Sequence, residues 1–288
     1  MSEQKNNGVA VVSREGSIGR ILLEMGKITP EDAEQVLRIQ REKGMRFGEA
    51  AQHLGLVTEA DIQGVLAHQF DYPYLLPGHS PYPVELVAAF HPFSVHVETL
   101  RAVRSQLMLR WFAQGEKSLM VAAVNGGEGA SFLAANLAIV FSQLGEHTLM
   151  VDANLRTPRQ HELFCLEGKQ GLSDILAGRA GLDVIQRTES FVDLSILPAG
   201  TLPPNPQELL GRSSFTKLND ELCKRYDVVL YDSPDFAGSA DPLTIASRVG
   251  GVLLAVRKDK TRLADVVALN EQVQRCNAEV VGSVLLEF

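Results

Sequence analysis

The residues that most clearly indicate chemistry form a glycine-rich loop, Asn-Gly-Gly-Glu-Gly-Ala-Ser, at positions 125–131. An apolar run, 119–124, precedes this loop, and a longer one, 133–141, follows it. A loop that joins a strand to a helix presents successive backbone N–H groups and the helix N-terminus to phosphate. We therefore expect it to bind the phosphates of ATP or ADP. The expected contacts are Gly126, Gly127, Glu128, Gly129, Ala130, Ser131 and Phe132.

One position of this loop departs from the usual pattern. Phosphate loops end in Gly-Lys-Ser or Gly-Lys-Thr, and their lysine reaches the β- and γ-phosphates. Here Ala130 occupies the lysine position. The sequence therefore predicts a nucleotide site that lacks one ammonium group.

Two carboxylates are expected beside the loop. The apolar runs 147–152 and 226–232 end in Asp152 and Asp232. In open α/β sheets, ligands bind at the carboxyl ends of the strands. A hydroxyl and two carboxylates are oxygen ligands of the kind that Mg²⁺ accepts alongside phosphate and water. Ser131, Asp152 and Asp232 are thus candidate ligands of a magnesium ion.

The elements that would position these residues alternate between strand-like and helical patterns. Strand-like runs lie at 119–124, 147–152, 193–198, 226–232, 251–257 and 280–286, and helical ones at 131–144, 205–225 and 263–276. This alternation predicts an α/β domain with a mostly parallel sheet and helices on both faces, the arrangement of P-loop NTPases. A small all-α domain is expected to precede it.

The N-terminal segment contains an internal repeat. Thr29 and Asp32 of the first copy correspond to Thr58 and Asp61 of the second. A threonine followed three residues later by an acidic residue resembles the capping box that begins a helix. Apolar residues then recur at helical spacing in both copies. The repeat predicts the small all-α domain, at residues 1–70.

The following segment, 71–96, is rich in proline and contains Tyr72, Tyr74 and Tyr82. Because proline fixes φ and lacks an N–H donor, this composition predicts an extended linker of limited flexibility. Its tyrosines either accept phosphate or pack the linker onto a domain. The predicted organisation is a helical domain at 1–70, a linker at 71–96 and an α/β domain at 97–288.

The bulk composition limits the classes of function. The formal net charge of −8 argues against a general nucleic-acid-binding protein. The sequence has neither an apolar run long enough to span a bilayer nor the apolar core of a signal peptide. Cys165, Cys223 and Cys276 lack metal-ligand spacing and are expected to be buried free thiols. We expect a cytoplasmic protein without nucleic-acid binding or direct membrane insertion.

Motifs in the α/β region resemble those of the bacterial tyrosine kinases of exopolysaccharide and capsule systems. Asp152-Ala-Asn-Leu-Arg156 is similar to their Asp-x-Asp-x-Arg motif, and the run that ends at Asp232 is similar to their Walker B strand. The resemblance covers nearly all of 97–288. It is greatest to the exopolysaccharide chain-length-determinant (EpsG-like) kinases.

A further motif of this family precedes the glycine loop. The kinases carry Glu-x-x-Arg-x-x-Arg at this place, and Glu98, Arg101 and Arg104 match it in spacing and position. The resemblance implies that these residues join subunits into a homo-oligomeric ring. It also implies a membrane polysaccharide co-polymerase, or chain-length determinant, as partner. The protein would then lie in the cytoplasm, peripheral to the inner membrane through that partner.

The N-terminal segment resembles the small N-terminal domain of type II secretion and type IV pilus ATPases, some of which bind cyclic di-GMP through a duplicated Arg-Leu-Gly…Gly…Gln motif. The second copy keeps Arg46-Phe47-Gly48, whereas the first has Ser17-Ile18-Gly19 and so lacks one guanidinium contact to a diphosphate. A helical docking module for a partner protein is the alternative. The residues that the resemblance assigns to cyclic di-GMP are Arg14, Gly19, Gly26, Gln40, Arg46, Gly48, Gly55 and Gln69.

Three departures from the kinase pattern argue against efficient phosphoryl transfer. Ala130 and Asn154 replace the lysine and the second carboxylate, and the tyrosine-rich tail is absent, since the last tyrosine is Tyr231. Electrostatic stabilisation of the transferred group is most of what such a protein contributes. The groups that could still act are a candidate base, Asp152, and candidate charge stabilisers, Arg156 and Arg159.

The sequence leaves four functions open. The first is a degenerate kinase-family protein that forms a ring and regulates exopolysaccharide chain length and export, with nucleotide binding retained or lost. The second is an active ATP-dependent protein tyrosine kinase, and the third a scaffold that responds to cyclic di-GMP. The fourth is a ParA/MinD-like ATPase. Those ATPases carry a signature lysine near the start of the loop, where this chain has Asn125, which counts against the fourth.

Overall fold

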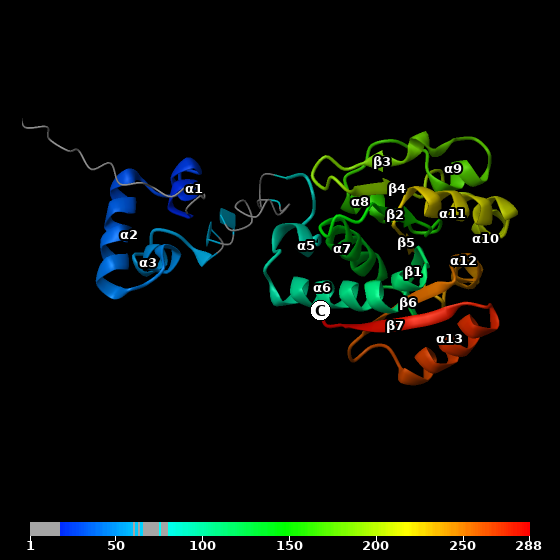
Figure 1. The fold of residues 1–288 in the computed structure, drawn as a ribbon. Helices are drawn as coiled ribbons and strands as arrows, with labels where there is room; N and C mark the ends of the chain where they lie inside the picture. Colours follow the sequence, from blue (N-terminus) through cyan, green and yellow to red (C-terminus); the bar gives the residue numbers. More distant parts are fainter. Residues whose placement is uncertain (1–17, 60, 63, 66–74, 76–79) are drawn as a thin grey trace, which may run out of the picture. The chain divides into compact units, whose positions relative to one another are not determined.

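A computed structural model describes residues 18–59, 61–62, 64–65, 75 and 80–288 of the protein. The chain divides into two compact units, Met1–Tyr72 and Pro73–Phe288 (Figure 1). Each unit is described by itself.

The described part of the first unit is helical, as the sequence predicts. Its labelled helices are α1 (Ile18–Glu24), α2 (Pro30–Lys43) and α3 (Phe47–His53). They enclose a small apolar core in which Leu22, Val36 and Val65 are fully buried. Burial of these side chains is the main force that holds so small a unit together.

Both predicted capping pairs are present. Thr29 accepts a hydrogen bond from the Asp32 N–H, and the Asp32 carboxylate accepts one from the Thr29 N–H, which closes the capping box of α2. Thr58 and Asp61 exchange the same two hydrogen bonds, at 2.9 and 3.2 Å. The two copies of the repeat therefore use the same local chemistry.

The second unit is built on a seven-stranded sheet with the strand order β3-β4-β2-β5-β1-β6-β7. Neighbouring strands run parallel, except that β3 pairs with β4 in the antiparallel direction. This confirms the predicted mostly parallel sheet. The strands are β1 (Ser118–Ala123), β2 (Thr148–Asp152), β3 (Gln186–Arg187), β4 (Leu194–Leu197), β5 (Val228–Asp232), β6 (Gly251–Arg257) and β7 (Glu279–Leu286).

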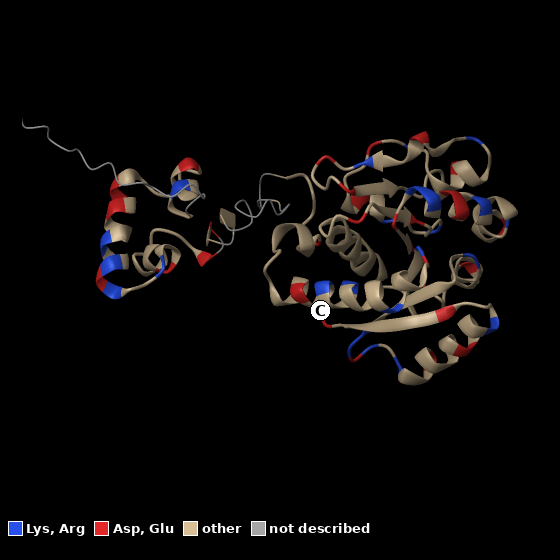
Figure 2. Ribbon diagram, in the orientation of Figure 1, with Lys and Arg blue, Asp and Glu red and all other residues tan. Residues whose placement is uncertain are grey.

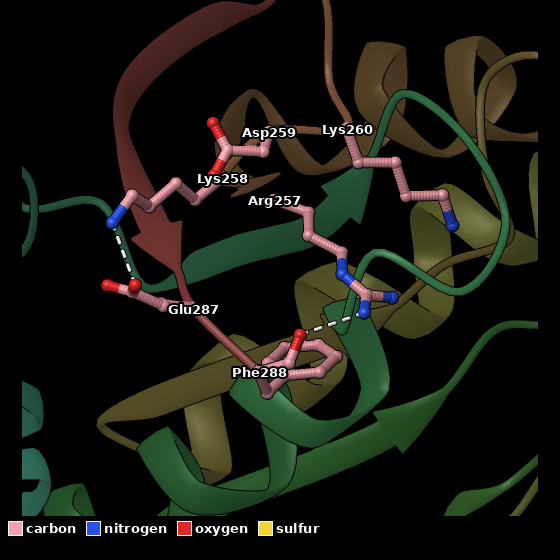
Figure 3. Close-up of a pocket in the computed structure, with 6 residues that line it drawn as sticks. All are labelled: Arg257, Lys258, Asp259, Lys260, Glu287 and Phe288. Carbon is pink, nitrogen blue, oxygen red and sulfur yellow. Dashed lines mark hydrogen bonds and ion pairs between the residues drawn. The ribbon is translucent and has the colours of Figure 1, made fainter.

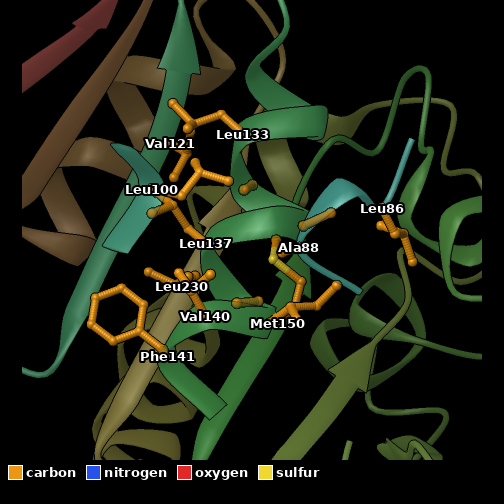
Figure 4. Close-up of a cluster of buried hydrophobic side chains, with 14 of the residues drawn as sticks. Leu86, Ala88, Leu100, Val121, Leu133, Leu137, Val140, Phe141, Met150 and Leu230 are labelled. Carbon is orange, nitrogen blue, oxygen red and sulfur yellow. The ribbon is translucent and has the colours of Figure 1, made fainter. Parts of the chain in front are cut away.

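Helices cover both faces of this sheet, because the side chains of its interior strand β1 alternate between two apolar clusters. Val121 of β1 belongs to the first cluster, with Leu137 and Phe141 of α7 (Figure 4). Met120 belongs to the second, with Phe215 of α11. The longer helices are α6 (Val95–Arg110), α7 (Ala130–Ser142), α11 (Ser213–Arg225), α12 (Asp241–Val249) and α13 (Leu263–Arg275). The shorter ones are α5 (Val87–Phe90), α8 (Gln160–Leu163), α9 (Leu172–Leu176), α10 (Pro206–Leu210) and the 3₁₀ helices Phe112–Gln114 and Leu182–Val184.

Two details of the predicted elements are wrong. The single helix expected at 205–225 is two helices, α10 and α11, which are separated at Gly211 and Arg212; glycine disfavours a helix interior by about 1 kcal/mol relative to alanine. The expected elements also lack α12, which begins with Asp241 and Pro242 and buries Ile245, Ala246 and Val249. The helix has only 9 residues, so its apolar pattern extends over little of the sequence.

The segment expected as a linker contributes to the second unit. Leu86 and Ala88 are fully buried in the first cluster of the sheet. Asn136 of α7 accepts a hydrogen bond from the Ala88 N–H at 2.9 Å and donates one to the Glu85 carbonyl at 2.9 Å. The described residues 80–96 are thus held on the α/β core, and the unit begins at Pro73 rather than at residue 97. Tyr82 packs on Phe191, at 5.9 Å between ring centroids.

The structure bears on two expectations from the composition, which concern membrane-spanning helices and the cysteines. Among the described residues, no helix combines the length and apolar character that crossing a membrane requires. The three cysteines are free thiols, but Cys165 is exposed and Cys223 and Cys276 are only partly buried. The expectation of three buried thiols is therefore wrong.

Candidate functional site

The glycine-rich loop lies between the end of β1 and the start of α7. Gly127 and Gly129 have φ values of 71° and 97°, which side chains with a Cβ rarely adopt. A cavity of about 300 Å³ opens beside the loop. All of the residues predicted as phosphate contacts, 126–132, line this cavity. Its other lining residues are Ala123, Asn125, Asn154, Thr157, Arg159, Ser233 and Asp235.

Glu128 holds the loop in this shape. Its carboxylate accepts hydrogen bonds from the Asn125 backbone N–H at 2.9 Å, the Asn125 side chain at 3.0 Å and the Thr261 hydroxyl at 2.7 Å. Burial raises the pKa of Glu128, but these hydrogen bonds and the nearby charge of Lys260 outweigh burial and leave it lowered. The carboxylate is thus engaged by the protein itself, a structural role that the sequence pattern did not separate from ligand binding.

With Ala130 as its first residue, helix α7 has no positively charged side chain at its start. Ala130 is the first residue of α7, and no residue of that helix is charged (Figure 2). The backbone N–H groups at a helix start favour an anion even so. Any positive charge that meets a phosphate here must therefore come from another element.

The two arginines predicted as charge stabilisers both have carboxylate partners. Arg156 forms a bidentate ion pair with Asp241, at 2.6 and 3.2 Å, and the Asp241 side chain is only 1% exposed. Arg159 lines the cavity, and its guanidinium donates to both carboxylate oxygens of Glu85 at 2.7 Å. Arg156 is accordingly a structural residue in this conformation, because leaving Asp241 buried and unpaired would be costly.

The structure brings the two predicted carboxylates together. Asp152 and Asp232 are register partners at the ends of β2 and β5, and both are fully buried. Burial and the charge of Asp232 raise the pKa of Asp152 well above its usual range. Burial raises the pKa of Asp232 to about 6, although hydrogen bonds from Gln160 and Ser131 act in the opposite direction. The pair therefore carries less than its full negative charge near neutral pH.

Asp152 is enclosed by backbone donors. Its Oδ2 accepts hydrogen bonds from the N–H groups of Arg159 and Gln160, at 3.0 and 2.9 Å, and its Oδ1 accepts one from Asn154 at 3.2 Å. Neither Asp152 nor Asp232 is among the described residues that line the cavity, since both side chains are fully buried. In this conformation Asp152 fixes the loop after β2, and its role as a base stays a prediction.

Gln160 is a site residue that the sequence analysis did not single out. Its side chain is fully buried and donates to Asp232 Oδ2 at 2.7 Å and to the Ser131 carbonyl at 3.2 Å. It thus links the glycine loop to the two carboxylates. No motif marks Gln160, so the sequence offers no signal for it.

Two of the three predicted magnesium ligands, Ser131 and Asp232, have chemistry that fits a magnesium ion. Within the described part of the chain, Asp232 Oδ1 is buried without a hydrogen-bond partner. The Ser131 hydroxyl acts on Asp232 closely enough to lower its pKa. Mg²⁺ usually takes one or two carboxylates together with phosphate oxygens and water. Ser131 and Asp232 would hold the ion, whereas Asp152 offers oxygens that already accept hydrogen bonds.

Asn154 stabilises the turn after β2. Its Oδ1 accepts hydrogen bonds from the backbone N–H groups of Arg156 and Thr157, at 3.3 and 3.0 Å. A carboxylate would accept the same two bonds. Its side chain also lines the cavity, so an asparagine in place of the second aspartate of the Asp-x-Asp-x-Arg motif removes a charge at the site and keeps the turn.

The predicted ring motif lies on α6. Arg101 forms an ion pair with Glu98, and Arg104 donates to the Val140 carbonyl of α7 at 2.7 Å. These contacts lie within one chain, and they leave the Glu98 side chain largely exposed. Assembly through these residues stays a prediction.

The glycines assigned to cyclic di-GMP have structural reasons in the first unit. A Cβ at Gly19 would lie 2.9 Å from the Phe47 ring, and one at Gly48 would lie 3.2 Å from Ile62. Gly26 and Gly55 have φ values of 64° and 69°. Gln40 is partly exposed and Arg46 exposed. Arg14 and Gln69 lie outside the described residues, so this binding also stays a prediction.

Comparison with known proteins gives a family model and several relatives of this chain. Residues 116–262 match the family model described as cellulose biosynthesis protein BcsQ. The chain is 31% identical to the tyrosine-protein kinase YwqD of Bacillus subtilis over 200 residues, which are 69% of this chain and 84% of that protein. It is 28% identical to a putative tyrosine-protein kinase in the cps region of Klebsiella pneumoniae, but the match covers 87% of this chain and only 35% of that protein.

A solved structure gives the same result for the fold. The kinase domain of the Escherichia coli tyrosine kinase ETK superposes with a TM-score of 0.69 at 28% sequence identity. The match covers 76% of this chain and 86% of that domain. The P-loop NTPase-like fold expected from the sequence is confirmed.

Proposed function

The chain belongs to the bacterial tyrosine kinase family, and we propose that it is a member that binds a magnesium nucleotide but transfers its phosphoryl group poorly. The single observation that carries this proposal is the cavity beside the glycine loop. The backbone of a phosphate site surrounds this cavity, and Ala130 stands where the catalytic ammonium belongs. The cavity thus supports nucleotide binding, and Ala130 argues against efficient phosphoryl transfer.

Nucleotide binding is supported by the groups that this chain keeps. The loop has left-handed glycines at 127 and 129, and Glu128 fixes its shape. Ser131 and Asp232 supply a hydroxyl and an unpartnered carboxylate oxygen for magnesium. The bound ion would neutralise charge on the phosphates. The backbone N–H groups would orient these phosphates at the start of α7.

Weak transfer is supported by the groups that are missing or engaged elsewhere. Ala130 brings no charge to the transferred phosphoryl group, and Asn154 brings none to a metal or a proton. Arg156 is paired with Asp241 and Arg159 with Glu85. The loss of one transition-state charge contact lowers the rate by a factor on the order of 10²–10³. A second loss lowers it further, though such effects need not add.

The cellular role that we propose is regulation of polysaccharide chain length or export. The matched family model is named for cellulose biosynthesis, and the Klebsiella relative for its cps region. The protein would form a ring through Glu98, Arg101 and Arg104. It would act at the cytoplasmic face of the inner membrane through a polysaccharide co-polymerase. The exposed side chain of Glu98 supports such an assembly, because it can reach a neighbouring subunit.

An active tyrosine kinase is the second candidate. The observation that favours it is the retained pair of buried aspartates, whose raised pKa values suit groups that exchange protons or bind a metal. Tyr231 is not an accessible phosphate acceptor, since its hydroxyl is fully buried and donates to Asn219 at 2.8 Å.

Calorimetric titration of the full chain with ATP or ADP tests the proposal. With Mg²⁺ present we expect measurable binding, and without it weaker binding. With labelled ATP and a tyrosine copolymer as substrate, we expect little transfer. Protein that binds no nucleotide at millimolar concentration would contradict the proposal. Rapid transfer by the wild type would favour the second candidate instead.

A further inference from the structure

A second set of basic residues lies next to the glycine loop, at the end of β6 and on the segment that joins β6 to α13. Arg257, Lys258 and Lys260 line a hollow of about 580 Å³ together with Asp259, Glu287 and Phe288 (Figure 3). The segment is more than 120 residues from the glycine loop in sequence, so no motif connects the two. The sheet connects them, because β6 is the neighbour of β1.

Lys260 points at the glycine loop itself. Its Nζ donates a hydrogen bond to the Gly126 carbonyl at 3.2 Å and lies 3.7 Å from the place where a Cβ of Gly127 would be. Figure 3 shows its side chain directed toward the loop that follows β1. Both contacted glycines line the 300 Å³ cavity. A positive charge therefore already lies at the start of the loop that lacks its own lysine.

The segment that carries Lys260 is fastened to the glycine loop. The adjacent Thr261 donates its hydroxyl to Glu128 at 2.7 Å, and the same hydroxyl accepts a hydrogen bond from the Arg257 N–H at 2.9 Å. The Arg257 guanidinium donates to the Gly127 carbonyl at 3.1 Å. These bonds fix the backbone of Lys260 beside the loop, while its own long side chain retains its rotations.

The other cations near the cavity are less suited to meet a phosphate. Arg156 and Arg159 are each paired with a carboxylate, Asp241 and Glu85. The Arg257 guanidinium lies 4.5 Å from the centroid of the Phe288 ring and donates to the Phe288 carbonyl. Among the ion pairs of the described residues, none includes Lys260, whose Nζ donates to a neutral carbonyl. The hydrogen bond of an ammonium group is stronger when its acceptor is charged, as in a phosphate, than when its acceptor is a neutral carbonyl.

We propose that Lys260 is the phosphate-binding cation of this site and replaces, in nucleotide binding, the ammonium that Ala130 lacks. When a nucleoside di- or triphosphate enters the cavity, Lys260 leaves the Gly126 carbonyl and donates to the terminal phosphate. The ligand class is therefore a nucleotide with at least two phosphates. This inference rests on the proposed nucleotide binding.

The test compares two lysines of the same segment. Lys258 is the matched control: it is exposed like Lys260, but its Nζ is paired with Glu287 at 2.7 Å and points away from the glycine loop (Figure 3). Affinities of the full chain for Mg-ATP and AMP are measured by calorimetry for wild type, Lys260→Ala and Lys258→Ala. We expect Lys260→Ala to weaken Mg-ATP binding about tenfold or more and Lys258→Ala to change it less than twofold.

Two further measurements sharpen this test. Binding of AMP should respond much less to Lys260→Ala, because AMP lacks the terminal phosphates. Adding Ala130→Lys to Lys260→Ala should restore Mg-ATP binding, because either ammonium can then serve the same phosphate.

Three results would overturn the inference alone. These are equal losses in the two single variants, unchanged Mg-ATP affinity in Lys260→Ala, and an equal loss for AMP and ATP. A wild type that binds no nucleotide would overturn the proposed function and this inference together, so the two failures are distinguishable.

Discussion

The substitution Asp232→Asn should make the nucleotide-free protein more stable at neutral pH. Asp232 is fully buried, and burial raises its pKa to about 6, whereas the pKa of aspartate in an unfolded chain is about 4. Two pKa units correspond to about 3 kcal/mol of penalty for the ionised form. The new amide N–H replaces the unpartnered Oδ1 and lacks an acceptor, which costs about 1 kcal/mol. The free energy of unfolding of Asp232→Asn at neutral pH should therefore exceed that of the wild type by about 2 kcal/mol.

The pH dependence of this gain follows from the sign of the shift. Because the folded state binds the Asp232 proton more tightly than the unfolded state, the free energy of unfolding of the wild type falls as the pH rises from about 4 to about 6. Above pH 6 the penalty is complete, and below pH 4 it is absent. Asp152 has a raised pKa as well, so its titration adds to the slope of the wild type.

Urea denaturation of wild type and Asp232→Asn between pH 4 and pH 8 checks this prediction. The two free energies of unfolding should differ by about 2 kcal/mol at pH 8, and the gain should disappear toward pH 4. Two curves that run parallel over the whole range would refute the reasoning. They would mean that Asp232 titrates in the folded chain as it does in the unfolded one.

Two other substitutions separate structural roles from chemical ones. Arg156→Gln leaves the carboxylate of the buried Asp241 without its ion-pair partner. The free energy of unfolding, measured by urea denaturation, should fall by about 2–3 kcal/mol. The loss should be smaller than for a fully buried pair, because the Arg156 side chain is 44% exposed. Adding Asp241→Asn should recover most of that loss, and a stable single variant with reduced transfer would instead support a charge-stabilising role. Glu128→Ala removes three accepted hydrogen bonds and should cost about 2 kcal/mol and weaken Mg-ATP binding in calorimetry. A variant unchanged in both respects would contradict the role given to Glu128.

The sequence predicted the parts of the site that depend on local pattern. The glycine loop, the apolar runs and the aspartates at the ends of β2 and β5 follow from spacing, because strands that run parallel must end at one edge. The register of β2 with β5 then places Asp152 beside Asp232. The capping pairs of the N-terminal repeat were predictable for the same reason, since each involves residues three positions apart.

The parts that the sequence did not predict depend on tertiary contacts. In the sequence, Arg156 is a cation without an evident partner close to the glycine loop. The fold brings Asp241, 85 residues later, into contact with it. Lys260 reads as one charge in a surface segment until β6 pairs with β1 and places it on Gly126. The sequence predicts a linker before residue 97 because this segment is rich in proline. Its apolar stretch, which packs on α7, is too short to give a clear pattern. Such contacts leave no periodic signal along the chain.

Phosphoryl transfer by Ala130→Lys tests the central claim most directly. Wild type and variant are compared with labelled ATP and a tyrosine copolymer at nucleotide concentrations that saturate both. If the missing ammonium at position 130 limits the reaction, transfer should rise by a factor on the order of 10² or more, even with Asn154 still in place of the second carboxylate. Equal transfer by the two proteins, with nucleotide bound in both, would contradict the claim that this one side chain limits the chemistry.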